Sequence, residues 1–142
     1  MKKKPFILPY KEKRRLHDRA FRAQQRDQSE VCGVMSVDRY SRIELHFLKN
    51  NSGKAGSFRI FSFDVMAIKQ TLKPHNQFIG LFHSHVVSEA IPGPRDIRNA
   101  LPSHLQLIYD VCGHEARLWR IKKDKKRKVA VEVPLILASR KN

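Results

Sequence analysis

Two histidines, His83 and His85, stand two residues apart, and a carboxylate, Asp96, follows them in the next segment of the chain. Imidazole nitrogens and a carboxylate oxygen are typical zinc ligands, and three protein ligands leave the fourth position of the metal to water. Zinc lowers the pKa of that water to about 7, so hydroxide becomes available at neutral pH. Glu30, far upstream, could carry protons from this water to a leaving amine if burial raises its pKa. These residues predict metal-assisted hydrolysis with one zinc ion per chain.

Each of these residues also has a simpler interpretation when it is taken alone. The chain contains 7 histidines among 142 residues, so chance produces roughly one third of a His-x-His pair per chain of this kind. Asp96 could be an ordinary helix N-cap, and Glu30 could be a solvated carboxylate at the end of a helix. The combination carries the prediction, not any single residue.

The histidines lie in the apolar run from Phe78 to Val87, which predicts a strand buried on both faces. Side chains two apart on a strand share a face, so His83 and His85 can converge on one ion while Ser84 points away. The segment from Ser88 to Arg95 contains prolines and cannot continue as a central strand. We expect it to loop back and place Asp96 at the start of a short helix that ends before Pro102.

The rest of the chain alternates helical and strand patterns and contains no internal repeat. We expect one helix at Lys11–Gln28, with an apolar stripe of Leu16, Ala20 and Ala23, and a second helix from Ser62, its N-cap, to about Lys73. We expect strands at Val31–Val37, Ile43–Leu48, Phe58–Phe61, Leu105–Val111, Ala116–Ile121 and Val129–Ile136. The basic run Lys122–Lys128 predicts the tip of a hairpin. This order indicates an α/β fold, a mixed sheet sandwiched between helices in a single compact domain. We expect a basic N-terminal extension at residues 1–10 and the domain at residues 11–142.

The pattern of candidate site residues resembles that of the JAMM/MPN-plus metalloproteases (the Mov34/MPN/PAD-1 group, including the prokaryotic JAB type). That pattern is an upstream Glu, then His-x-His, seven residues, Ser, two residues and Asp. Glu30, His83, His85 and Asp96 fall in register with it, and the run Glu30–Val34 looks like the family's Glu-x-Cys-Gly segment. The resemblance covers roughly Lys11 to Ile136. RadC-type proteins share the His-x-His and the acidic loop, but the Glu-x-Cys-Gly segment and the small size favour the isopeptidase branch.

The resemblance implies a JAMM/MPN fold, related to that of cytidine deaminases, and the roles of the site residues. His83, His85 and Asp96 would hold the zinc, and Glu30 would act as general base and then as general acid. One residue departs from the pattern, because Gly93 occupies the family's serine position. Loss of one oxyanion donor typically costs about 10²–10³ in rate. A backbone N–H could replace the serine, since glycine allows close approach, and Ser88 is a weaker candidate.

The resemblance also implies a substrate class. We expect a zinc isopeptidase or deubiquitinase-like hydrolase that removes or processes a ubiquitin-like protein modifier, whose extended tail adds beside a sheet edge. Activating and conjugating enzymes of the same pathway would be further partners. Two alternatives stay open. Gly93 favours a catalytically weak or inactive binding module with the same fold, and the charge favours a protein that associates with nucleic acid.

Composition limits the class of protein. The net charge is +16, concentrated at Lys2–Lys4, Lys11–Arg22 and Lys122–Lys128, which predicts attraction to an acidic partner or nucleic acid but no specific readout. No apolar run approaches the roughly 20 residues of a membrane span, and no signal peptide with a cleavage site is present. Cys32 and Cys112 cannot form a disulfide framework and predict reduced thiols. We therefore expect a cytoplasmic protein without a membrane segment.

Overall fold

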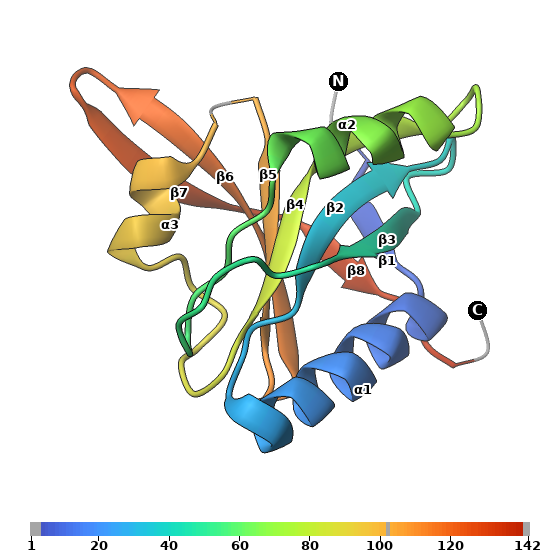
Figure 1. Ribbon diagram of the computed structural model, residues 1–142. Coiled ribbons are helices and arrows are strands. Elements are labelled where there is room, and N and C mark those ends of the chain that lie inside the picture. Colours follow the sequence, from blue (N-terminus) through green and yellow to red (C-terminus); the bar gives the residue numbers. More distant parts are fainter. Residues whose placement is uncertain (1–3, 102, 141–142) are drawn as a thin grey trace.

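The fold is a six-stranded mixed sheet with helices packed around it and a small two-stranded sheet beside it (Figure 1). The computed structural model describes residues 4–101 and 103–140. The elements are β1 (Phe6–Leu8), α1 (Tyr10–Asp27), β2 (Cys32–Val37), β3 (Ile43–Leu48), α2 (Ser62–Thr71), β4 (Gln77–His85), α3 (Pro94–Asn99), β5 (Leu105–Asp110), β6 (Glu115–Asp124), β7 (Arg127–Val133) and β8 (Leu135–Leu137).

The large sheet has the strand order β3-β2-β4-β5-β6-β7. Only β4 and β5 run parallel, and the other neighbours are antiparallel. The parallel pair needs a crossover, and the chain between β4 and β5 supplies it through the loop after His85 and the helix α3. The predicted α/β architecture with a mixed sheet flanked by helices is therefore confirmed, and this crossover is the segment that carries Asp96.

The two faces of the sheet bury different groups. On β5, Leu107 and Tyr109 join the main core, to which α1 contributes Leu16 and Ala20. Ile108 points the other way, because side chains alternate along a strand, and packs with Trp119 and with Ala90 of the crossover loop. Helix α1 therefore covers one face, and the crossover covers the opposite face. His83 lies directly opposite Ile108 in the register of β4 and β5, so the histidines share the crossover face.

Gly33 of the Glu-x-Cys-Gly segment is required by a close approach between strands. Its hydrogen faces the carbonyl oxygen of His46 on β3 and the ring of Phe82 on β4, and a Cβ there would collide with both. Only glycine lets these backbones come so near. The segment that follows Glu30 is thus packed tightly between its two neighbouring strands.

Several expected boundaries are wrong. Residues 58–61 form no strand, since the Asn50 side chain accepts the Arg59 N–H in place of a neighbouring strand. Helix α2 begins at Ser62 with Phe61 as its N-cap, and Ser62 is therefore not the cap. Helix α3 begins at Pro94, two residues before Asp96, as suits a proline whose φ is already helical.

The C-terminal strand is also divided. A single strand was expected at Val129–Ile136, but β7 ends at Val133 and β8 begins at Leu135. Pro134 separates them because it has no N–H for the ladder. Strand β8 then pairs in parallel with β1, a strand that the sequence did not reveal. The assignment of residues 1–10 as an extension stays a prediction, although β1 lies within it. Residues 1–3 and Pro102, the expected helix stop, lie outside the described residues.

The hairpin expected around Lys122–Lys128 is confirmed. It is formed by the ends of β6 and β7, with Lys123 opposite Lys128 and Asp124 opposite Arg127. Among the helices of the described residues, none is long and apolar enough to cross a membrane.

Candidate metal centre

Three potential metal ligands meet at the end of β4. The Nε2 atoms of His83 and His85 are 3.2 Å apart. Asp96 closes the triangle, with Oδ1 3.4 Å from His83 Nε2 and Oδ2 3.4 Å from His85 Nε2. In a tetrahedral zinc site with zinc–nitrogen bonds of 2.0–2.1 Å, neighbouring ligand atoms are about 3.3 Å apart. The donor set and its spacing therefore fit a zinc ion without rearrangement of the strand or the helix.

A hydrogen bond at Nδ1 orients the imidazole of His85 so that Nε2 faces the other two candidate ligands. Nδ1 lies 2.6 Å from the carbonyl oxygen of Glu89. A carbonyl can only accept, so Nδ1 carries the hydrogen, and in the neutral ring the Nε2 lone pair is left for a metal. The His83 ring is buried and stacks on Phe58, with the ring centroids 4.3 Å apart. Phe58 therefore shields this side of the donor set from water.

Asp96 is fixed by the crossover segment. The backbone N–H of Gly93 donates to Asp96 Oδ2 at 2.9 Å, which orients the carboxylate in the first turn of α3. The loop before this helix is anchored to the sheet, because the indole N–H of Trp119 donates to the carbonyl of Ala90 at 2.8 Å. The side-chain amide of Gln106 on β5 donates to the carbonyl oxygen of Asp96. The position of Asp96 thus depends on strands β5 and β6 as well as on its own helix.

Burial and charge shift the pKa values of these groups in opposite directions. Burial lowers the pKa of His83, although contact with Asp96 opposes this. Burial also works to lower the pKa of His85, but the hydrogen bonds to Asp96 and the Glu89 carbonyl outweigh it, and the net shift is upward. Burial works to raise the pKa of Asp96, but its hydrogen bonds with both histidines dominate and hold that pKa far below the usual range. Asp96 is therefore anionic at neutral pH, as a metal ligand must be.

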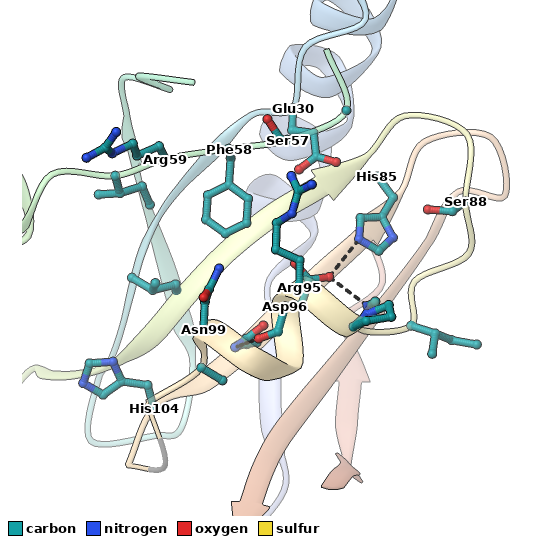
Figure 2. A pocket seen from close by; sticks show the side chains of 18 of the residues that line it. Glu30, Ser57, Phe58, Arg59, His85, Ser88, Arg95, Asp96, Asn99 and His104 are labelled. Atoms are coloured by element: carbon teal, nitrogen blue, oxygen red, sulfur yellow. Dashed lines mark hydrogen bonds and ion pairs between the residues drawn. The ribbon is translucent and has the colours of Figure 1, made fainter. Parts of the chain in front are cut away.

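Glu30 lies beside this cluster, in the connection between α1 and β2, and is 7% exposed. Burial raises the pKa of its carboxyl to about 7, with Asp96 contributing in the same direction and His85 and Arg95 opposing it. Figure 2 shows the Glu30 carboxylate and the Arg95 guanidinium pointing toward one another next to His85. A carboxyl with this pKa can both accept and donate a proton near neutral pH.

Two residues that the sequence analysis did not identify hold Glu30 in place. Ser84, between the two histidines, faces away from them as predicted, and its hydroxyl accepts the N–H of Val31 at 2.9 Å. Asn50 donates to the carbonyl oxygens of Glu30, at 2.8 Å, and Ser57, at 3.0 Å. Both are short polar residues with distant partners, so no local sequence signal marks their role.

The cluster opens into a groove of about 540 Å³ on the crossover face. One wall is the segment Gly56–Ile60, which Asn50 organises, and the other wall is α3 with the residues after it (Figure 2). The groove is lined by Glu30, His85 and Asp96, and Figure 2 shows His104 on the side away from Glu30 and His85. An extended chain that enters this groove would pass beside Glu30, His85 and Asp96.

The structure also locates the residues considered for the family's serine position. The Gly93 N–H, a potential replacement for the hydroxyl, is already bonded to Asp96. Ser88 lies on the exposed loop beyond His85 and lines the groove. A Cβ on Gly93 would meet nothing nearer than Asp96 Oδ2 at 3.8 Å. The local structure can therefore accommodate a serine at position 93, and the absence of its hydroxyl does not disturb the donor set.

Comparison with solved structures identifies the same fold in three proteins of low sequence identity. A protein from Desulfitobacterium hafniense, solved in solution, aligns with a TM-score of 0.74 and 23% identity over 94% of this chain and 92% of its own. A JAB1/MPN domain protein from Archaeoglobus fulgidus aligns with a TM-score of 0.57 and 13% identity over 92% and 99%.

The third is a structure described as JAMM, a metalloprotease-like zinc site in the proteasome and signalosome. It aligns with a TM-score of 0.53 and 10% identity, over 96% of this chain and all of the other. A comparison with curated proteins gives no match. A family model for prokaryotic homologs of the JAB domain matches residues 13–122, a range that includes Glu30 and all three candidate ligands. The resemblance inferred from the sequence is thereby confirmed, and the chain belongs to this family of prokaryotic JAB-domain proteins.

Proposed function

We propose that this protein is a zinc-dependent peptidase that cleaves a peptide or isopeptide bond at the carboxyl end of a ubiquitin-like protein. The observation that carries the proposal is the juxtaposition of a zinc-compatible donor triangle with a buried carboxyl of pKa about 7. Perturbed acids beside metal-type donors in a groove are typical of hydrolytic sites. The fold neighbour with a metalloprotease-like zinc site supports the same chemistry.

The residues divide the work of hydrolysis. His83, His85 and Asp96 would hold the metal, which when bound supplies Lewis acidity and lowers the pKa of a coordinated water. The Glu30 carboxylate would take a proton from the attacking water and return it to the leaving nitrogen, because the pKa of this carboxyl lies near neutrality. The contact between His85 Nδ1 and Glu89 keeps the imidazole in one tautomer. Phe58 limits the access of water to His83.

The groove supports an extended substrate. Ser57, Asn99 and Gln106 line it with groups that can bind a peptide backbone, and its walls come from α3 and the segment Gly56–Ile60. The flexible tail of a ubiquitin-like protein is a chain of this type, and it would place its last carbonyl at the donor triangle. The enzymes that activate and conjugate such a modifier would act in the same pathway.

The first experiment measures metal content by elemental analysis. We expect about one zinc per chain in the purified protein and a loss of zinc in the double variant His83→Ala, His85→Ala. Glu30→Gln should keep the zinc, because Glu30 is not part of the donor triangle. A protein that stays without zinc after incubation with zinc salts would refute the proposal before any substrate is tested.

The second experiment measures cleavage. A panel of ubiquitin-like proteins, each joined through its C-terminal tail to a reporter protein by a linear or an isopeptide bond, would be incubated with the zinc-loaded protein. We expect cleavage of at least one conjugate at the tail junction, with a loss of about 10³-fold or more in Glu30→Gln. Cleavage that survives Glu30→Gln would contradict the role of this carboxyl.

Gly93 supports a second candidate function, a non-catalytic binding module with an intact metal site. The serine hydroxyl of the related enzymes is absent, and the Gly93 N–H is used by Asp96. The variant Gly93→Ser separates the two functions. If the natural protein cleaves no conjugate and Gly93→Ser creates cleavage, the natural protein is a binding module.

A further inference from the structure

A row of basic side chains leads away from the candidate metal centre along α3. We define the basic ridge as the exposed residues Arg95, Arg98, Lys122, Lys123, Lys125, Lys126, Arg127 and Lys128. The hairpin part contains one acidic residue, Asp124. Within the described part of the chain, no ridge residue has an acidic partner within 4.0 Å, whereas Arg14, Arg15 and Arg26 of α1 each have one. Apart from the charge of Arg95, which faces the Glu30 carboxylate, the positive charge of the ridge is therefore left for a partner.

The hairpin is held at the end of α3. Lys128 Nζ donates to the carbonyl oxygens of Arg98, at 2.9 Å, and Ala100, at 3.2 Å. Figure 1 shows the tip of the β6–β7 hairpin projecting beyond the body of the sheet on the side of α3. The first turn of the same helix carries Asp96. The hairpin and the metal centre are thus connected through one short, anchored helix.

The spacing between the two sites corresponds to a short stretch of polypeptide. Helix α3 has six residues, or about 9 Å at 1.5 Å per residue. The hairpin tip adds two or three strand residues and the length of a lysine side chain, which gives about 25 Å in total. An extended chain rises about 3.3 Å per residue, so about eight residues reach from the metal centre to the tip. Arg95 lies at the near end of this path.

We propose that the basic ridge binds an acidic stretch of the substrate polypeptide, within about ten residues of the bond that is cleaved. The inference rests on the proposed function, because it takes the groove as the place of the scissile bond. Acidic side chains would contact Arg95 and Arg98 first and the hairpin lysines farther along. The ridge would then select among substrates that offer the same bond to the metal centre.

The observations favour an acidic polypeptide over a nucleic acid as the occupant. Single-stranded nucleic acids are commonly held by aromatic side chains that stack on bases, and Lys122–Lys128 contains no aromatic residue. The groove that continues from the ridge offers the amides of Asn99 and Gln106, which pair with peptide groups. The reaction proposed at the metal centre also acts on the carbonyl carbon of a peptide or isopeptide bond, which favours a polypeptide as the occupant.

The test measures binding without cleavage, in a zinc-loaded Glu30→Gln background. Three fluorescein-labelled probes would be compared by anisotropy at about 50 mM salt: a 12-residue peptide with five glutamates, the same peptide with five glutamines, and a 12-nucleotide oligothymidylate. We expect the glutamate peptide to bind at least about tenfold more tightly than the glutamine peptide. The preference should largely disappear at about 0.5 M salt, where charges are screened within about 4 Å.

Charge reversal locates the site. We expect Lys125→Glu with Lys126→Glu to weaken glutamate-peptide binding at least about tenfold. The matched control is Lys11→Glu with Arg22→Glu, two exposed residues of α1 on the opposite face of the sheet, which changes the net charge equally. The control should change the affinity less than about threefold.

Three results would overturn the inference. The two peptides could bind equally, or the hairpin and α1 variants could lose the same affinity for the glutamate peptide. Oligothymidylate could also bind more tightly than the glutamate peptide, through the hairpin lysines. The last result would assign the ridge to nucleic acid. These outcomes do not depend on hydrolysis. A protein that binds the glutamate peptide through the ridge but cleaves no conjugate would refute only the peptidase proposal.

Discussion

The buried carboxyl of Glu30 should make the metal-free protein less stable as the pH rises. Its pKa increases from 4.5 to about 7 on folding, chiefly because burial disfavours the charged form. The folded state therefore holds this proton more tightly than the unfolded state does. A raised pKa contributes stability that is fully present below the unfolded value, and this contribution is lost as the pH rises through the folded value. Glu30→Gln removes the ionisation and should stabilise the protein at high pH.

The magnitude follows from the size of the shift. One pKa unit corresponds to about 1.4 kcal/mol, so the shift from 4.5 to about 7 represents about 3 kcal/mol. Between about pH 5 and pH 8, the free energy of unfolding of the natural protein should fall by about 2 to 3 kcal/mol relative to that of Glu30→Gln. Zinc would reduce the difference, because its charge favours the carboxylate.

Urea denaturation of the chelator-treated proteins at several pH values measures this difference directly. Glu44→Gln, which replaces an exposed carboxylate on β3, gives the baseline for exchanging a carboxylate and an amide. The histidines titrate in both proteins, so their contribution largely cancels in the comparison. If the natural protein and Glu30→Gln differ by the same free energy at every pH, Glu30 is not a buried acid with a raised pKa, and its proposed role as proton carrier loses its physical basis.

Three further results are expected. Ser84→Ala should lower the free energy of unfolding by about 1–3 kcal/mol in urea denaturation, because the Val31 N–H loses its acceptor; an unchanged midpoint would show that this bond does not hold the Glu30 segment. Gly93→Ser should change that free energy by less than about 0.5 kcal/mol, as its Cβ meets no neighbour closer than 3.8 Å; a larger loss would contradict the space found there. A thiol reagent at neutral pH should modify Cys112, which is exposed, and spare Cys32, whose pKa burial raises to about 12; rapid loss of both thiols would show that β2 opens readily.

The meeting of the three candidate ligands could be predicted because its geometry is mostly local. The period of a strand brings His83 and His85 to one face, and the prolines after them require a loop that can return Asp96 to the strand end. The structure shows both features, with Asp96 3.4 Å from each histidine. The position of Ser84 on the other face follows from the same period.

The parts of the site that could not be predicted depend on contacts between distant segments. Phe58 was assigned to a strand by its neighbours, but it stacks on His83 because Asn50 holds the segment across the groove. The pairing of β1 with β8 joins the two ends of the chain, and strands of three residues carry too little pattern to reveal their partner. Periodicity describes one element at a time and does not contain such information.

The two carboxylates of the site show most directly why residue types alone do not assign roles. Asp96 lies 3.4 Å from Nε2 of each histidine and accepts the Gly93 N–H, and these interactions hold its pKa far below the usual range although it is partly buried. Glu30 lies near the same His85, its carboxyl has no such hydrogen bond within the described residues, and burial raises its pKa to about 7. Neighbouring acids whose environments separate their pKa values typically divide the functions of charge and proton transfer. The division proposed here, Asp96 as a permanent anion for the metal and Glu30 as the proton carrier, follows from the different surroundings of the two carboxylates: the histidines and the Gly93 N–H around Asp96, and the burial of Glu30.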